Sequence, residues 1–72
     1  MKNKIIEIIS TIAKIDKVEL IEKVDTEKLW ESIAHVEIVI ALEEEFDIVF
    51  TQEEIGNMTT ILKIIDIVKA KV

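Results

Sequence analysis

The sequence of 72 residues contains no cysteine, no proline, one glycine and three aromatic residues. Without cysteine, the chain can form neither a disulfide framework nor a thiolate metal site, and its own side chains supply no thiol. Without proline, and with Gly56 as its single glycine, it carries few signals for tight β-turns or a linker. No apolar run approaches the roughly eighteen residues of a membrane span, and Glu7 and Lys14 interrupt the isoleucines near the N-terminus. We therefore expect a cytoplasmic protein without membrane insertion.

Negative charge is concentrated in the middle of the chain. The net charge is −6, yet all nine basic residues are lysines that lie outside the stretch from Leu29 to Leu62, which contains eight carboxylates. Nucleic-acid binding depends on clustered lysine and arginine, so this balance argues against a nucleic-acid partner. It favours protein partners that carry basic patches.

Hydrophobic periodicity predicts an all-α fold: a small four-helix bundle with three longer helices and one short helix. The predicted helices span about residues 3–15, 32–47, 52–56 and 60–71. Between the first two, residues 16–30 are expected to form a long connection with at most a turn or two of helix, held down by Val18, Ile21, Val24 and Leu29. The chain is expected to form one domain over residues 1–72. A domain this small buries only about 60% of its unfolded surface, which favours a surface-based function over a deep catalytic cavity.

Helix ends can be predicted from a few residues. Thr51 and Glu54 have the spacing of a capping box at the start of the short helix, and Gly56 is expected to take the left-handed conformation at its end. Thr59 or Thr60 is expected to cap the last helix.

The helix over residues 32–47 has two apolar faces. One recurs at every fourth residue and is expected to line the core through Ile38, Leu42 and Phe46. The other is edged with carboxylates and is typical of a docking surface, with Ile33, Val36 and Ile40 beside Glu37 and Glu44.

Ser32 begins this helix and admits three interpretations. A serine at a helix start is most often a cap whose oxygen accepts from backbone N–H groups. The unsatisfied N–H groups and positive dipole end also favour a phosphate ester attached there. The third interpretation is a catalytic pair in which Ser32 is the nucleophile and His35 its base, with Glu31 nearby. Three such residues on one exposed helical turn have nothing around them to exclude water.

The neighbouring residues have simpler expected roles. His35 is otherwise expected to be exposed or lightly packed, and Trp30 is expected to pin the connection against the bundle without a stacking role. One histidine, no cysteine and consecutive glutamates argue against a metal site.

The residues around Ser32 resemble acyl carrier proteins. Glu31-Ser32-Ile33 corresponds to the family's Asp-Ser-Leu motif, and Val36-Glu37, the stretch from Ala41 to Ile48 and Met58-Thr59-Thr60 also match. The resemblance covers about residues 2–70. It implies a four-helix carrier domain that is not an enzyme, with 4′-phosphopantetheine attached covalently to Ser32 and holding acyl intermediates as thioesters.

The same resemblance implies partners and a docking site. The expected partners are a phosphopantetheinyl transferase and the acyl-loading and acyl-processing enzymes of fatty-acid-like or specialised biosynthesis, acting on a monomer. The docking residues are then Glu31, Ile33, Val36, Glu37, Ile40, Glu43 and Glu44. An acyl chain is expected to lie between the second and third helices against Ile38, Leu42, Phe46 and Ile55. Two rival hypotheses remain open: an unmodified acidic helical adaptor, and a small hydrolase that uses Ser32 and His35.

Overall fold

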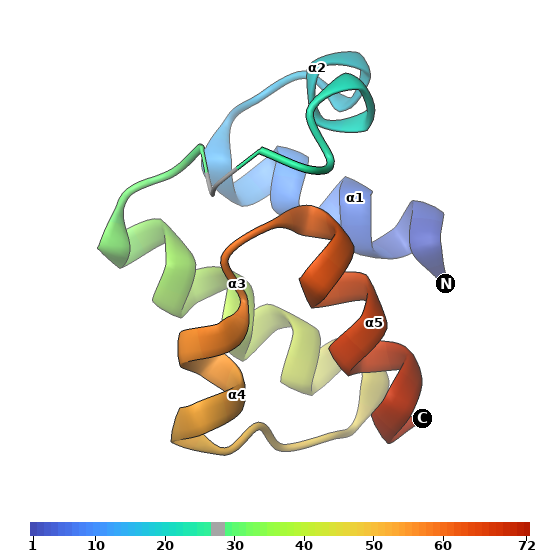
Figure 1. The fold of residues 1–72 in the computed structure, drawn as a ribbon, viewed down its shortest axis with the longest axis vertical. Coiled ribbons are helices and arrows are strands. Elements are labelled where there is room, and N and C mark those ends of the chain that lie inside the picture. Colours follow the sequence, from blue (N-terminus) through green and yellow to red (C-terminus); the bar gives the residue numbers. More distant parts are fainter. Residues whose placement is uncertain (27–28) are drawn as a thin grey trace.

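A helix that carries Ser32 at its first residue is the longest of five helices in the computed structural model, which describes residues 1–26 and 29–72. The helices are α1 (Lys2–Ala13), α2 (Lys17–Glu22), α3 (Ser32–Phe46), α4 (Gln52–Asn57) and α5 (Ile61–Lys71). The predicted all-α bundle is therefore confirmed, with the predicted helical turns of the connection forming α2. Residues 27 and 28, inside that connection, lie outside the described part. In Figure 1 the start of α3 lies on the side opposite both termini.

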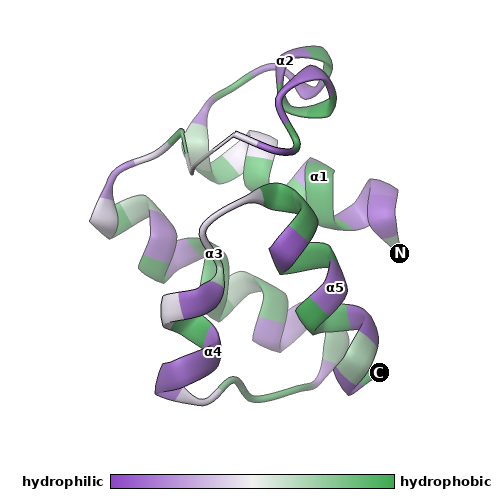
Figure 2. Cartoon of the chain, viewed as in Figure 1, coloured by the Kyte–Doolittle hydropathy of each residue, from purple (hydrophilic) through white to green (hydrophobic). Residues whose placement is uncertain are grey.

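Most of the core is built from aliphatic side chains of α1, α3 and α5, and Leu20 of α2 with Trp30, Phe50 and Met58 of the connections completes it. α1 packs against α2, α3 and α5, and the apolar segments of these helices alternate with polar ones along each ribbon (Figure 2). The inward face of α5 consists of the buried residues Ile61, Ile64, Ile65 and Val68. On α3, Ile38 and Leu42 are completely buried, and Phe46 packs against the core from a half-buried position, as does Ile55 of α4. The expected core-lining residues therefore do line the core.

The connection between α1 and α3 is held down by a residue that the sequence pattern did not single out. Leu20 is completely buried, whereas Val18 and Ile21 are more than half exposed. The reason is that α2 is a helix of six residues, so one side faces the core and a residue one or two positions away points outward. Val24 and Leu29 are half-buried as expected, and the Val24 carbonyl accepts a hydrogen bond from the Leu62 N–H at 3.2 Å.

The capping predictions hold at two helix starts and fail at one helix end. Thr51 and Glu54 form the reciprocal capping box, and Thr60 accepts a hydrogen bond from the Lys63 N–H. The prediction for Gly56 was wrong, because α4 continues through Asn57 and Gly56 has no positive φ. The left-handed residues in the described part are Lys14 after α1 and Asp47 after α3.

Candidate functional site

Ser32 is an exposed residue in the first turn of α3, but it is not the helix cap. The N-cap is Glu31, which is extended with φ −77° and ψ 167° and makes no capping hydrogen bond through its side chain. Ser32 is thus the first residue with helical geometry, one position past the place from which a side chain caps the helix. Among the described residues its hydroxyl has no hydrogen-bond partner. The cap interpretation was therefore wrong, and the hydroxyl is left available at the surface.

The backbone around Ser32 presents hydrogen-bond donors. The first intrahelical bond of α3 runs from the His35 N–H to the Glu31 carbonyl at 3.0 Å. The N–H groups of Ser32, Ile33 and Ala34 precede it and have no acceptor within the described part of the chain. Free N–H groups and the positive end of the helix dipole both favour an anion bound at this turn.

His35 is buried, with 7% of its surface exposed, so the expectation of an exposed or lightly packed histidine was wrong. Its Nδ1 accepts a hydrogen bond from the Trp30 indole N–H at 3.0 Å, and its Nε2 lies 3.2 Å from the Ile55 carbonyl oxygen. The two rings are nearly parallel, with 13° between their planes. Trp30 is pinned to the bundle as predicted, but it also lies against an aromatic ring, which was not predicted.

These contacts bear on the hydrolase hypothesis. A serine nucleophile needs a neighbouring imidazole nitrogen to take its proton. In this structure both nitrogens of His35 are already engaged, one by Trp30 and the other by Ile55. The arrangement therefore does not make a Ser32–His35 pair. The position of His35 could have been read from the sequence, because it precedes Ile38 by three residues and Leu42 by seven, on the buried face of α3.

The strip predicted as a docking surface lies open along α3. Ile33, Val36 and Ile40 are 77%, 55% and 50% exposed, and Glu31, Glu37 and Glu44 are exposed as well. Glu43 differs from the other acids, because it is half-buried and its Oε2 accepts a hydrogen bond from the Phe50 N–H at 2.9 Å. Glu43 thus ties the segment after α3 to the helix, and only part of its carboxylate remains for a partner.

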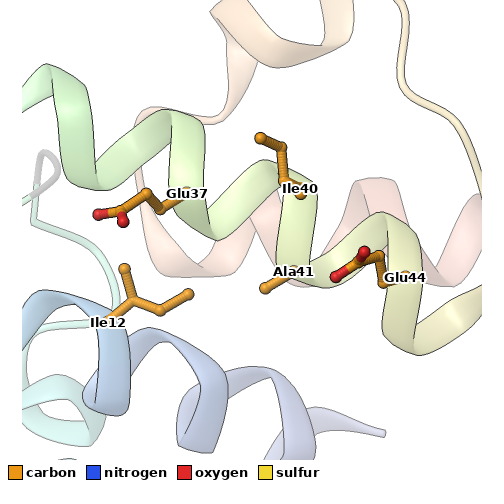
Figure 3. Close-up of a pocket in the computed structure, with 5 residues that line it drawn as sticks. All are labelled: Ile12, Glu37, Ile40, Ala41 and Glu44. Atoms are coloured by element: carbon orange, nitrogen blue, oxygen red, sulfur yellow. The ribbon is translucent and has the colours of Figure 1, made fainter.

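Two adjoining hollows follow the line where α3 meets α1. The larger, of about 350 Å³, is lined by Ile12, Glu37, Ile40, Ala41 and Glu44. Figure 3 shows Ile12 of α1 reaching toward α3 beneath Glu37 and Ala41, with Glu44 further along the helix. The second, of about 220 Å³, shares Ile12 and Ala41 and adds Glu7, Ile8 and Thr11. Neither is lined by Ile38, Leu42, Phe46 or Ile55, the residues expected to line the acyl chain between α3 and α4, so that position stays a prediction.

The salt bridges of the described part join four lysines to acids outside the strip. Lys4 lies within 4.0 Å of Glu7 and Glu45, Lys17 pairs with Glu7, Lys23 with Glu19, and Lys71 with Glu54 at 3.1 Å. The hydrogen bond and charge of Lys4, with the charge of Lys17, hold the pKa of Glu7 below its ordinary value. Glu37 and Glu44 form no salt bridge with any residue that the structure describes. Their charges are left for a partner.

Two further kinds of site have no support in the described residues. No three or more of their histidine and acidic side chains come together as metal ligands. None of their helices combines the length and apolar character needed to cross a bilayer.

Comparison with known proteins gives one kind of relative. No family model matches the chain. It is 46% identical over 39 residues to the acyl carrier protein of Buchnera aphidicola subsp. Baizongia pistaciae (strain Bp), a match that covers 54% of this chain and 50% of the relative. The chain thus spans about half the length of the curated relative that it matches. The resemblance to acyl carrier proteins predicted from the sequence is confirmed as a similarity over this part.

Proposed function

We propose that this protein is an acyl carrier whose 4′-phosphopantetheine arm is attached to the Ser32 hydroxyl. The observation that carries the proposal is that Ser32 is exposed at the first residue of α3, with a hydroxyl that no described residue engages. The similarity to an acyl carrier protein supports the same reading. When bound there, the arm supplies the thiol, and with it the thioester chemistry, that a chain without cysteine lacks.

The residues around Ser32 fit such a group. The free N–H groups of the first turn of α3 stabilise the negative charge of a phosphodiester at the Ser32 oxygen. The extended backbone at Glu31 carries the preceding segment away from the helix, and Ser32 and Ile33 are both exposed. A modifying enzyme can therefore reach the hydroxyl without any rearrangement of the bundle.

In this proposal partner enzymes dock on the strip of Ile33, Val36 and Ile40 with Glu31, Glu37 and Glu44. The partners are a phosphopantetheinyl transferase and the acyl-loading and acyl-processing enzymes of fatty-acid-like or specialised biosynthesis in the cytoplasm. Carboxylates that form no salt bridge with a described residue, beside exposed aliphatic side chains, match a partner surface that has lysine or arginine around an apolar centre. A tethered acyl group then reaches several active sites at high local concentration.

The test uses the two serines of the chain. The purified protein is incubated with coenzyme A, Mg²⁺ and a broad-specificity phosphopantetheinyl transferase, and its intact mass is measured. We expect the mass of one phosphopantetheine to be added to the wild type and to Ser10→Ala, and nothing to Ser32→Ala. Ser10 is the matched control because its hydroxyl is half-buried and donates a hydrogen bond to the Ile15 carbonyl at 2.6 Å.

Two outcomes would contradict the proposal. Modification of Ser32→Ala would place the arm elsewhere. A folded wild type that gains no mass would favour the unmodified adaptor, which uses the acidic strip for docking alone.

A further inference from the structure

His35 connects two segments that are distant in the sequence. Trp30 lies two residues before Ser32, and Ile55 lies in α4, twenty residues after His35. The indole N–H can only donate, so Nδ1 of His35 must be the acceptor. The Ile55 carbonyl can only accept, so Nε2 must carry a proton. Both bonds exist together only for a neutral imidazole protonated at Nε2.

α4 has few other attachments to the bundle. None of its six residues is buried, and its capping box joins Thr51 to Glu54 locally. Half-buried Ile55 and the Glu54–Lys71 ion pair hold it to the rest of the chain. Among the described residues, the bond from His35 to Ile55 is the side-chain hydrogen bond that joins α4 to α3.

We propose that His35 is a positioning residue that latches α4 and the Trp30 segment together across the first turn of α3, and so controls opening of the α3–α4 seam beside Ser32. Opening this seam moves α4 away from α3, the helix that carries the completely buried Ile38 and Leu42. That motion breaks the hydrogen bond between Nε2 of His35 and the Ile55 carbonyl. The hydrogen bond from the Trp30 indole to Nδ1 survives only if the imidazole ring stays beside Trp30. The latch therefore couples the backbone before Ser32 to the position of α4.

The first test needs no modification of Ser32, so it is independent of the proposed function. His35 and Trp30 are the single histidine and the single tryptophan of the chain, which makes their NMR signals unambiguous. A two-bond ¹H–¹⁵N spectrum of the wild type at neutral pH should show a protonated Nε2 and an unprotonated Nδ1. The opposite tautomer, or a mixture of the two, would overturn the proposal.

Amide exchange then tests the coupling. In His35→Phe the ring volume is kept but both hydrogen bonds are lost. We expect the Trp30 indole N–H, the Ile55 amide of α4 and the amide of its C-cap Met58 to exchange about tenfold faster together, because the buried indole loses its acceptor and the Ile55 carbonyl keeps only the hydrogen bond from the Met58 N–H. Lys71→Gln is the matched control. It removes the ion pair with Glu54, so it should raise the exchange rates of the α4 amides without changing the exchange rate of the Trp30 indole N–H. If the exchange rates of the indole N–H and of the α4 amides in His35→Phe stay within about twofold of the wild-type rates, the proposal is wrong.

Trp30→Phe keeps the test decisive if His35→Phe does not fold. It leaves His35 in place and removes the donor to Nδ1, together with part of a buried side chain. Exchange in α4 should still be faster, because the ring is no longer fixed in one tautomer. Exchange in α4 that stays at the wild-type rate in this variant would show that Trp30 and α4 are not coupled.

A second test rests on the proposed function and uses protein loaded with an octanoyl group. Weakening the latch should let the acyl chain enter the seam more often. The amide shifts of Ile38, Leu42 and Ile55 should then change more on loading in Trp30→Phe than in the wild type. Equal shift changes in loaded forms of confirmed mass would overturn the control of the seam by His35, while failure of loading would count against the carrier proposal alone.

Discussion

Ser32 and Thr51 each carry a hydroxyl at the beginning of a helix, but only the Thr51 hydroxyl caps its helix. Thr51 is the N-cap of α4 and its oxygen accepts from the Glu54 N–H at 3.1 Å. Ser32 is one position further into its helix, after the N-cap Glu31. A shift of one residue thus separates a hydroxyl used for stability from one left at the surface.

This difference predicts unequal effects of removing the two hydroxyls. Thr51→Ala should lower the free energy of unfolding by about 1 kcal/mol, because it removes a helix cap. Ser32→Ala should change it by less than about 0.5 kcal/mol, because no described contact is lost. Urea denaturation followed by circular dichroism compares the two. An equal loss in Ser32→Ala would restore the cap interpretation of Ser32.

The same residues mark how far the sequence could predict the site. Ser32 and the exposed apolar strip follow from local spacing, which the sequence contains. The pairing of His35 with Trp30 and Ile55 does not, because the Ile55 carbonyl is supplied by packing of α4 against α3. Glu43 is a similar case: its bond to the Phe50 N–H depends on the path of the chain after Asp47. Polar groups whose partners come from other elements are the part that sequence spacing leaves undetermined.

Among the helices, the long ones were predictable and the short ones less so. α3 and α5 have several turns, so the apolar residues of the buried face recur often enough for the sequence pattern to show that face. α2 has six residues, so one buried residue, Leu20, carries its packing, and the pattern that included Val18 and Ile21 placed the wrong side inward. α4 also has six residues, and its end was placed one residue early.

Because α4 extends to Asn57, Gly56 lies inside the helix, where glycine is destabilising. Gly56 is exposed, its φ is not positive, and a Cβ added to it would meet nothing within 4 Å. Gly56→Ala should therefore stabilise the protein by about 0.5–1 kcal/mol, since alanine loses less backbone entropy in a helix. Thermal unfolding should show a midpoint higher by about 2–8 °C for a domain of this size. A lower midpoint would mean that Gly56 needs the left-handed conformation after all.

α4 also gives the fold a dependence on acid. The Thr51 N–H and the Lys71 ammonium hold the pKa of Glu54 below its ordinary value of 4.5. The unfolded chain then binds the Glu54 proton more readily than the folded chain, so stability is full above this value and is lost as the pH falls through the lower folded-state pKa. The urea midpoint of the wild type should fall from neutral pH to about pH 3, and that of Glu54→Gln should start lower and fall less. Glu53→Gln, which keeps the capping box, is the control, and parallel curves for Glu54→Gln and wild type would contradict the assignment.

The acidic residues of the described chain fall into two groups, those that form ion pairs with lysines and those that do not. The described lysines that form ion pairs use acids of α1, α2 and α4, with Glu45 at the far end of α3. Glu37 and Glu44 both line the hollow between α3 and α1 from the α3 side, and neither has a paired cation in the described residues. The field that a partner meets is therefore dominated by α3, and it should steer association through charge rather than through shape alone.

This uneven field predicts how modification of Ser32 depends on salt. Glu37→Lys and Glu44→Lys should each slow modification by about fivefold to tenfold at low ionic strength while the circular dichroism spectrum stays helical, because each reverses a charge that attracts a basic partner. The deficit should shrink as added salt shortens the screening length from about 30 Å to about 8 Å. Asp66→Lys makes the same charge change at an exposed site on α5 and should modify at nearly the wild-type rate. If it slows modification as much as the two α3 variants do, net charge rather than the strip governs docking, and the docking surface must be sought elsewhere.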